Sequence, residues 1–157
     1  MAEPKFVIQG VDYPMHSRDT YNMDELQLLY ELTGITIDQD NPKIAWATFS
    51  GWRSGDGYPH IVMTSDGGNT WVDIVGKKLP QAPINDVIRH PSKPKWLFVA
   101  TDVGVFRTTN LGKTWLKVGD NLPLVPVNDI DLPAGSNTLY AATYGRSVWT
   151  TSLADAG

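Results

Sequence analysis

The chain has 157 residues, a formal net charge of −4 and no cysteine. Its length is that of one ordinary domain, and its acidic and basic residues are interspersed, which argues against a nucleic-acid or anionic-membrane partner. The absence of cysteine excludes disulfides, thiolate metal sites and cysteine nucleophiles. We find no signal-peptide pattern and no apolar run long enough to span a membrane, so we expect a soluble protein of unassigned compartment.

Residues 1–33 precede the repeated part of the sequence. Residues 5–9 have the composition of a strand, whereas residues 23–32 favour a short helix capped by Asn22. The end of that segment, residues 29–32, could equally open a strand. In the whole chain, six Trp, six Tyr, 14 Gly and 11 Pro punctuate short apolar runs, which is typical of an all-β protein.

Several short phrases return in the same order along the chain. Residues 64–71 recur as 108–115, and residues 83–87 recur as 126–130. Each repeat is expected to contain short antiparallel strands, and the third lacks its fourth strand. The expected strands are 34–38, 43–49, 60–64 and 70–75, then 84–89, 95–101, 105–109 and 114–118, and finally 127–132, 138–144 and 147–152.

Four short strands in a unit of about 40 to 45 residues are typical of a β-propeller blade. We therefore expect an N-terminal segment (1–33) and three blades, with boundaries at 34–80, 81–123 and 124–157. The fold predicted is an all-β partial propeller of about three four-stranded blades, the last completed by another strand. Helical repeats are disfavoured because Pro and Gly interrupt every run.

The repeated octet resembles the Asp-box, Ser/Thr-x-Asp-x-Gly-x-Thr-Trp, of BNR-repeat propellers. That family includes sialidases, sortilin-type receptors, xyloglucan-cleaving glycosidases and photosystem assembly factors, and the present chain resembles their C-terminal blades. The box positions are Thr64, Asp66, Gly68, Thr70 and Trp71, and then Thr108, Asn110, Gly112, Thr114 and Trp115. Asn110 departs from the pattern. The resemblance implies a structural turn, with side-chain oxygens bonding to the backbone and each Trp filling space between blades.

Catalytic and metal-binding interpretations of the acidic residues are weaker. Asp66 lacks the further acidic ligands of a calcium loop, and the three histidines have no metal-ligand spacing. Asp86 and Asp129 occupy equivalent places in neighbouring repeats and are the best candidates for a glycosidase carboxylate pair, although such pairs also serve turns or line channels. The few arginines disfavour sialidase chemistry. We expect no metal and no cofactor.

An inserted loop, residues 51–59, offers a different kind of site. It carries Trp52, Arg53 and Tyr58, whose rings and polar groups suit sugar stacking or protein contact. Arg146, in the phrase that resembles the closing segment of larger propellers, is a further candidate for ligand binding. The alternative is that Trp52 and Tyr58 pack on their own blade.

Three blades are fewer than the four to eight of a typical closed propeller, so we expect a homo-oligomer. A two-fold dimer would give a six-bladed ring, and residues 5–9 could supply the missing strand in the same chain or in its neighbour. The favoured function is a non-catalytic module that binds a carbohydrate or a protein through the assembled ring. A subunit or fragment of a glycoside hydrolase and a purely structural fragment stay open as alternatives.

Overall fold

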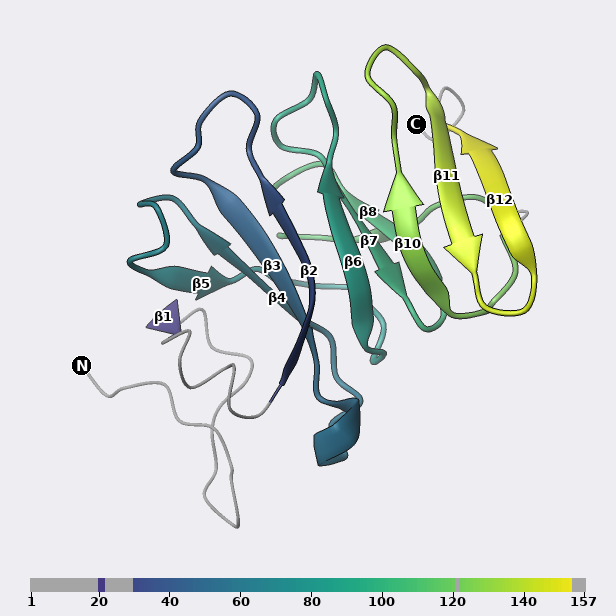
Figure 1. Ribbon diagram of the computed structural model, residues 1–157, viewed down its shortest axis with the longest axis horizontal. Helices are drawn as coiled ribbons and strands as arrows, with labels where there is room; N and C mark the ends of the chain where they lie inside the picture. The colour runs from purple at the N-terminus through teal and green to yellow at the C-terminus, as the bar shows by residue number, and fades with distance from the viewer. Residues whose placement is uncertain (1–19, 22–29, 121, 154–157) are drawn as a thin grey trace.

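The computed structural model describes residues 20–21, 30–120 and 122–153, which form three antiparallel sheets (Figure 1). The sheets succeed one another along the chain as the blades of an open, partial β-propeller. The predicted all-β fold is thereby confirmed. No helix in this described part of the chain is long and apolar enough to cross a membrane.

Blade 1 is a five-stranded sheet in the order β1-β5-β4-β3-β2. Its elements are β1 Thr20–Tyr21, β2 Glu31–Ile37, β3 Ala45–Ser50, the 3-10 helix η1 Trp52–Ser54, β4 His60–Thr64 and β5 Trp71–Asp73. β2 begins at Glu31, three residues before the expected start at residue 34. Glu31 and Leu32 therefore belong to a strand and not to the end of the expected helix. The expected strand at 5–9 and most of the expected helix at 23–32 lie outside the described residues.

Blades 2 and 3 follow with four and three strands among the described residues. Blade 2 contains β6 Ile84–Arg89, β7 Leu97–Thr101, β8 Gly104–Thr108 and β9 Leu116–Lys117. Blade 3 contains β10 Val127–Asp131, β11 Thr138–Thr143 and β12 Ser147–Ser152. The strands β4, β6 and β12 have the bounds expected from the sequence, because turn residues flank each of these runs.

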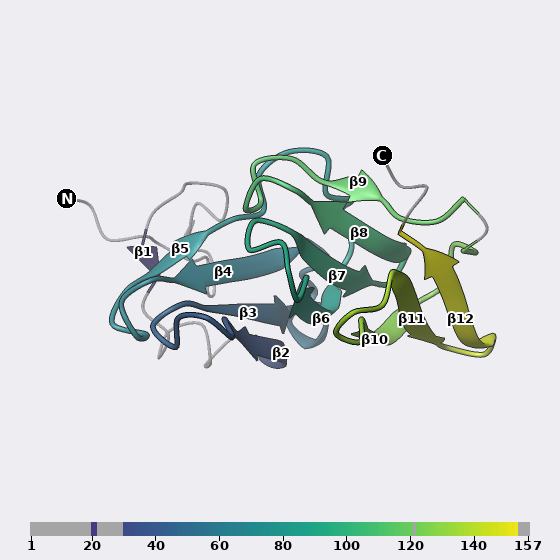
Figure 2. The ribbon, with the colours of Figure 1, turned by 90° about the horizontal axis from the view of Figure 1, so that it is seen from above.

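The inner strands β2, β6 and β10 lie next to one another, and the outer strands β5 and β9 lie on the opposite side of the molecule (Figure 2). Successive residues of a strand point to opposite faces of its sheet. Leu97 and Val99 therefore pack toward blade 1 with Trp46, whereas Phe98 and Ala100 pack toward blade 3. The core thus consists of two layers, one between each pair of consecutive blades.

Each inner strand contains a β-bulge at the same register position. The pairing shifts between Leu32 and Gly34, between Ile84 and Asp86, and between Val127 and Asp129. A bulge leaves one residue outside the regular ladder and re-aims its side chain. These extra residues are Thr33, Asn85 and Asn128.

Candidate functional site

The first box turn, between β4 and β5, is held by side-chain oxygens. The Thr64 hydroxyl donates to Oδ1 of Asp66 at 2.8 Å, and that oxygen also accepts the backbone N–H of Thr70 at 2.9 Å. The Thr70 hydroxyl donates to Oδ2 of Asp66 at 2.6 Å. These hydrogen bonds, led by the one from the Thr70 hydroxyl, lower the pKa of Asp66 to about 2. All these partners of Asp66 belong to its own turn, which Asp66 stabilises.

The second box turn, between β8 and β9, repeats this network with an amide. Thr108 donates to Oδ1 of Asn110 at 2.9 Å, and Thr114 donates its backbone N–H to the same oxygen at 3.0 Å. Where Asp66 accepts the threonine hydroxyl, Asn110 donates its amide to Oγ1 of Thr114 at 2.8 Å. Asn110, which stands where the Asp-box pattern has Asp, therefore makes the same set of contacts without a negative charge.

The box glycines and tryptophans complete the turns. Gly68 and Gly112 have φ angles of 91° and 82°, in the region where glycine carries no Cβ penalty. Trp115 is fully buried between blades 1 and 2, and its Nε1 donates to the carbonyl of Ile74 at 3.3 Å. Trp71 instead bonds within its own turn, to the carbonyl of Gly68.

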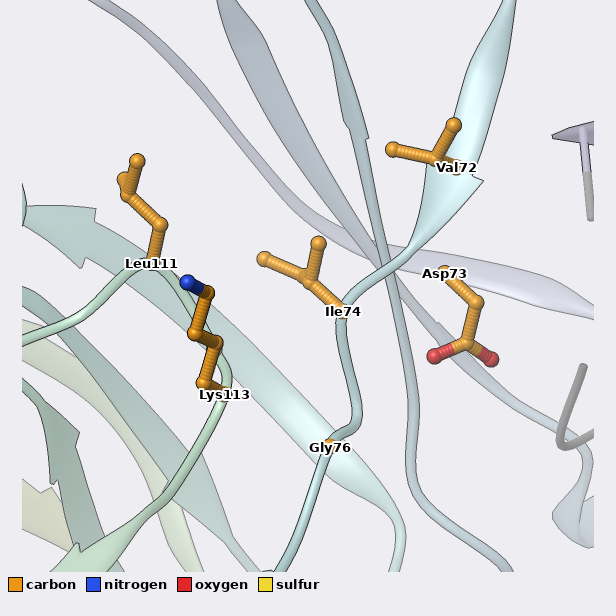
Figure 3. Close-up of a pocket in the computed structure, with 7 residues that line it drawn as sticks. Val72, Asp73, Ile74, Gly76, Leu111 and Lys113 are labelled. Atoms are coloured by element: carbon orange, nitrogen blue, oxygen red, sulfur yellow. The ribbon is translucent and has the colours of Figure 1, made fainter. Parts of the chain in front are cut away.

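A cavity of about 280 Å³ lies at this outer junction, where the second box turn meets the chain leaving β5 (Figure 3). Its walls are Val72, Asp73, Ile74, Gly76, Leu111, Gly112 and Lys113. The backbones meet directly here, since Lys77 donates to the carbonyl of Lys113 at 3.1 Å and accepts from Trp115 at 2.9 Å. We interpret this cavity as a packing seam between blades.

Asp86 lies at the junction of blades 2 and 3, whereas Asp129, its register equivalent in β10, is exposed. Oδ1 of Asp86 accepts the backbone N–H of Val87 at 2.8 Å, and Oδ2 accepts that of Ile130 at 3.1 Å. Burial raises the pKa of Asp86, and the charge of Asp129 acts in the same direction. Both carboxylate oxygens of Asp86 therefore accept backbone N–H groups, which is the arrangement of a carboxylate that holds a junction together.

A second, open groove of about 360 Å³ lies at the inner junction of blades 1 and 2. It is lined by Glu31, Thr33, Ser50, Trp52, Arg53, Pro83, Asn85 and Asp102. Trp52, the first residue of η1, is 71% exposed, so its ring is available to a ligand. Nε of Arg53 lies 3.5 Å from Glu31, and the amide of Asn85 donates to Asp102 at 2.9 Å.

The inserted loop is anchored by a cluster around Asp56. Oδ2 of Asp56 accepts from the Tyr30 hydroxyl at 3.0 Å and lies 3.1 Å from Nε2 of His60, while Oδ1 accepts the backbone N–H of Tyr58. Burial opposes ionisation of Asp56, but the hydrogen bonds from His60 and Tyr58 outweigh it and lower the pKa to about 2. Burial and the Asp56 charge raise the pKa of Tyr30. This anchor gives η1 a defined position.

Not every predicted binding residue reaches the groove. Trp52 and Arg53 line it, whereas Tyr58, 43% exposed, and Arg146, exposed in the β11–β12 turn, do not. Sequence reasoning missed Glu31, Asn85 and Asp102. Two signals were available: Asp102 follows β7 in a hairpin turn, and Asn85 belongs to the phrase at 83–87 that recurs at 126–130.

The described part of the chain contains no group of three or more His, Asp or Glu residues that could hold a metal ion. Among the described residues, the groove offers two carboxylates, a guanidinium, an amide and an indole ring. This set can stack on a ring and hydrogen-bond to hydroxyl groups.

No protein-family model matches the sequence. Over 74 residues, the chain is 39% identical to a xyloglucanase of Hypocrea jecorina (strain QM6a), a match covering 46% of this chain and 9% of the relative. Among solved structures, an ancestral GH74 enzyme superposes with a TM-score of 0.64 at 17% identity, covering 82% of this chain and 20% of that one. The fold is that of propeller blades.

A second structural neighbour is YCF48 from Cyanidioschyzon merolae, with a TM-score of 0.55 at 19% identity. This match covers 78% of the present chain and 34% of YCF48. The chain thus spans about a third or less of the proteins it resembles here, and it corresponds to some of their blades.

Proposed function

We propose that the chain is a non-catalytic recognition unit that binds xyloglucan, or a closely related polysaccharide, in the groove between blades 1 and 2. The observation that carries this proposal is the exposed ring of Trp52 beside Glu31, Arg53 and Asp102 in one groove. An aromatic face packs against the C–H face of a sugar, and flanking polar groups bond to its hydroxyls.

The sequence likeness to a protein named xyloglucanase supports this choice of polysaccharide. Two structural neighbours, an ancestral GH74 enzyme and that of Niastella koreensis, support the blade architecture alone, because each is 17% identical to this chain. The hydrogen bonds from the backbone N–H groups of Val87 and Ile130 occupy both carboxylate oxygens of Asp86, which favours recognition over hydrolysis by Asp86 and Asp129.

Affinity electrophoresis and titration calorimetry with soluble xyloglucan test the proposal. Trp52→Ala is expected to weaken binding about tenfold, the loss that one aromatic stacking contact represents. Leu116→Ala is the matched control, because Leu116 is also exposed but lies on the outer strand β9. Unchanged binding in Trp52→Ala, or no binding by the native chain, would contradict the proposal.

A glycoside hydrolase is the second candidate, and the specific observation in its favour is that Glu31 and Asp102 both line the groove. If the native chain releases reducing ends from xyloglucan and Asp102→Asn abolishes this release, the chain is a hydrolase and not a recognition unit. Peptide binding is the third candidate, because one neighbour of the same fold is YCF48 bound to D1 peptide. Failure to bind either class of ligand would leave a purely structural role.

A further inference from the structure

The junctions between blades share a repeated polar contact at the bulges of the inner strands. The hydroxyl of Thr33 in β2 donates to the carbonyl of Ile84 in β6 at 2.7 Å. The amide of Asn85 in β6 donates to the carbonyl of Val127 in β10 at 2.9 Å. Each bulge side chain thus reaches the residue just before the bulge of the next blade, so one rule describes both junctions.

Blade 3 carries the same polar groups on a face that no described blade covers. The register pairs Asp86 with Ala100 and Asp129 with Ala142, so Asn128 and Asp129 are the equivalents of Asn85 and Asp86. Asn128 and Asp129 are exposed. In blade 2, the equivalent pair bonds to the backbone of the following blade.

The apolar part of this face shows the same relation. Val105 pairs with Ala100 and is fully buried against blade 3, whereas its equivalent Val148 pairs with Ala142 and is 62% exposed. Phe98 is likewise fully buried, and its equivalent Tyr140 is 42% exposed. Blade 3 therefore presents the surface with which blade 2 binds its successor.

Blade 1 presents the complementary surface at the other end of the array. Ile84 and Val87, which face blade 1 from β6, are 0% and 1% exposed. Their register equivalents in β2 are Leu32 and Ile35, which are 45% and 59% exposed. The side chains that a preceding blade covers in blades 2 and 3 are thus uncovered in blade 1.

We infer that the exposed face of blade 3 docks on the exposed face of blade 1 of a second copy of this chain. In this junction, the amide of Asn128 donates to the carbonyl of Leu32, and Asp129 accepts the backbone N–H of Ile35. Two such junctions, related by a two-fold axis, close a ring of six blades, which lies within the usual range of four to eight. Three copies would give nine blades, outside that range.

Light scattering coupled to size-exclusion chromatography tests this assembly on the full chain at micromolar concentration. The native chain is expected to elute with twice the 17.3 kDa mass of one copy. Ile35→Lys and Val148→Glu are each expected to give monomers, because each places a charge in both junctions. Leu124→Glu is the matched control, since Leu124 is 73% exposed and lies in the segment between blades 2 and 3; it is expected to stay dimeric.

Mixing the two monomeric variants gives the sharper result. A heterodimer of Ile35→Lys with Val148→Glu has one native junction and one that pairs lysine with glutamate, so equimolar mixing is expected to restore the dimer. Asn128→Ala is expected to weaken dimerisation about tenfold, through the loss of one hydrogen bond in each of two junctions. A monomeric native chain, or a dimer that neither charge disrupts, would overturn the inference. Circular dichroism verifies that the variants are folded.

Discussion

The carboxylate of Asp86 accepts the backbone N–H of Ile130 at 3.1 Å, which joins blade 2 to blade 3 through a side chain. The inner strands of neighbouring blades belong to separate sheets and are not hydrogen-bonded to each other as strands. The backbone polar groups at their bulges are therefore satisfied by side chains of the neighbouring blade. In blade 1 the equivalent residue is Gly34, which packs directly against Asp86 and leaves no room for a side chain. The two junctions therefore share a rule but differ in detail.

Asp86→Ala is expected to destabilise the chain by about 1 to 3 kcal/mol, because the N–H groups of Val87 and Ile130 lose their acceptor. The raised pKa of Asp86 makes the folded state bind more protons than the unfolded state, so its contribution to stability falls as the pH rises above about 4. The loss on substitution should therefore be greater at pH 4.5 than at pH 7.5. Urea unfolding at the two pH values checks this, and an equal or opposite difference would contradict it.

Asp66 has the opposite pH dependence. Its pKa of about 2 lies below the ordinary value, so its contribution to stability is present above about pH 4 and is lost as the pH falls toward 2. Asp66→Asn is expected to keep the turn, as Asn110 does in blade 2, and to reduce the fall in melting temperature between pH 5 and pH 2. Asp66→Ala removes the turn bonds and should lower the melting temperature at every pH. An equal fall in melting temperature for the native chain and the Asp66→Asn variant would refute this.

Gly76 tests the close approach of blades 1 and 2. A Cβ at this position would overlap the carbonyl oxygen of Gly112, and the φ angle of 57° already disfavours other residues. Gly76→Ala is expected to cost about 3 kcal/mol, which combines overlap with backbone strain. Gly135→Ala is the control, because Gly135 has a φ angle of 78° but open space around its Cβ position; it should cost about 1 kcal/mol. Chemical unfolding that ranks the two variants equally would contradict this view of the junction.

The Asp56 anchor links the inserted loop to the proposed ligand groove. Asp56→Ala removes the acceptor of Tyr30, Tyr58 and His60 and should increase amide hydrogen exchange across residues 51–59. Xyloglucan affinity is expected to fall about tenfold because Trp52 loses its defined position, and the cost of ordering the loop passes to the ligand. Tyr30→Phe removes one of these bonds and should have a smaller effect. If Asp56→Ala speeds amide exchange in the loop but leaves xyloglucan affinity unchanged, the order of the loop does not contribute to ligand binding, and the prediction is contradicted.

Local patterns predicted the blades well. Residues 84–89 are flanked by prolines 83 and 91 and form β6 with those bounds. β2 was placed too late, because the apolar spacing of residues 23–32 also fits a helix and the strand was expected to begin only after it. The groove was predicted only in part, through Trp52 and Arg53, because Glu31, Asn85 and Asp102 reach it from three separate elements of two blades.

The sequence alone determined the strands, the turns and the three-blade repeat, because alternation, glycine placement and side-chain capping act over a few residues. Only the tertiary structure decided which side chains meet across blades. Asp86 accepts the backbone N–H of Ile130, and Trp52 shares a groove with Asp102, because bulges and sheet packing re-aim residues that are distant in the chain. The register of one blade on the next depends on these long-range contacts and is absent from any local pattern.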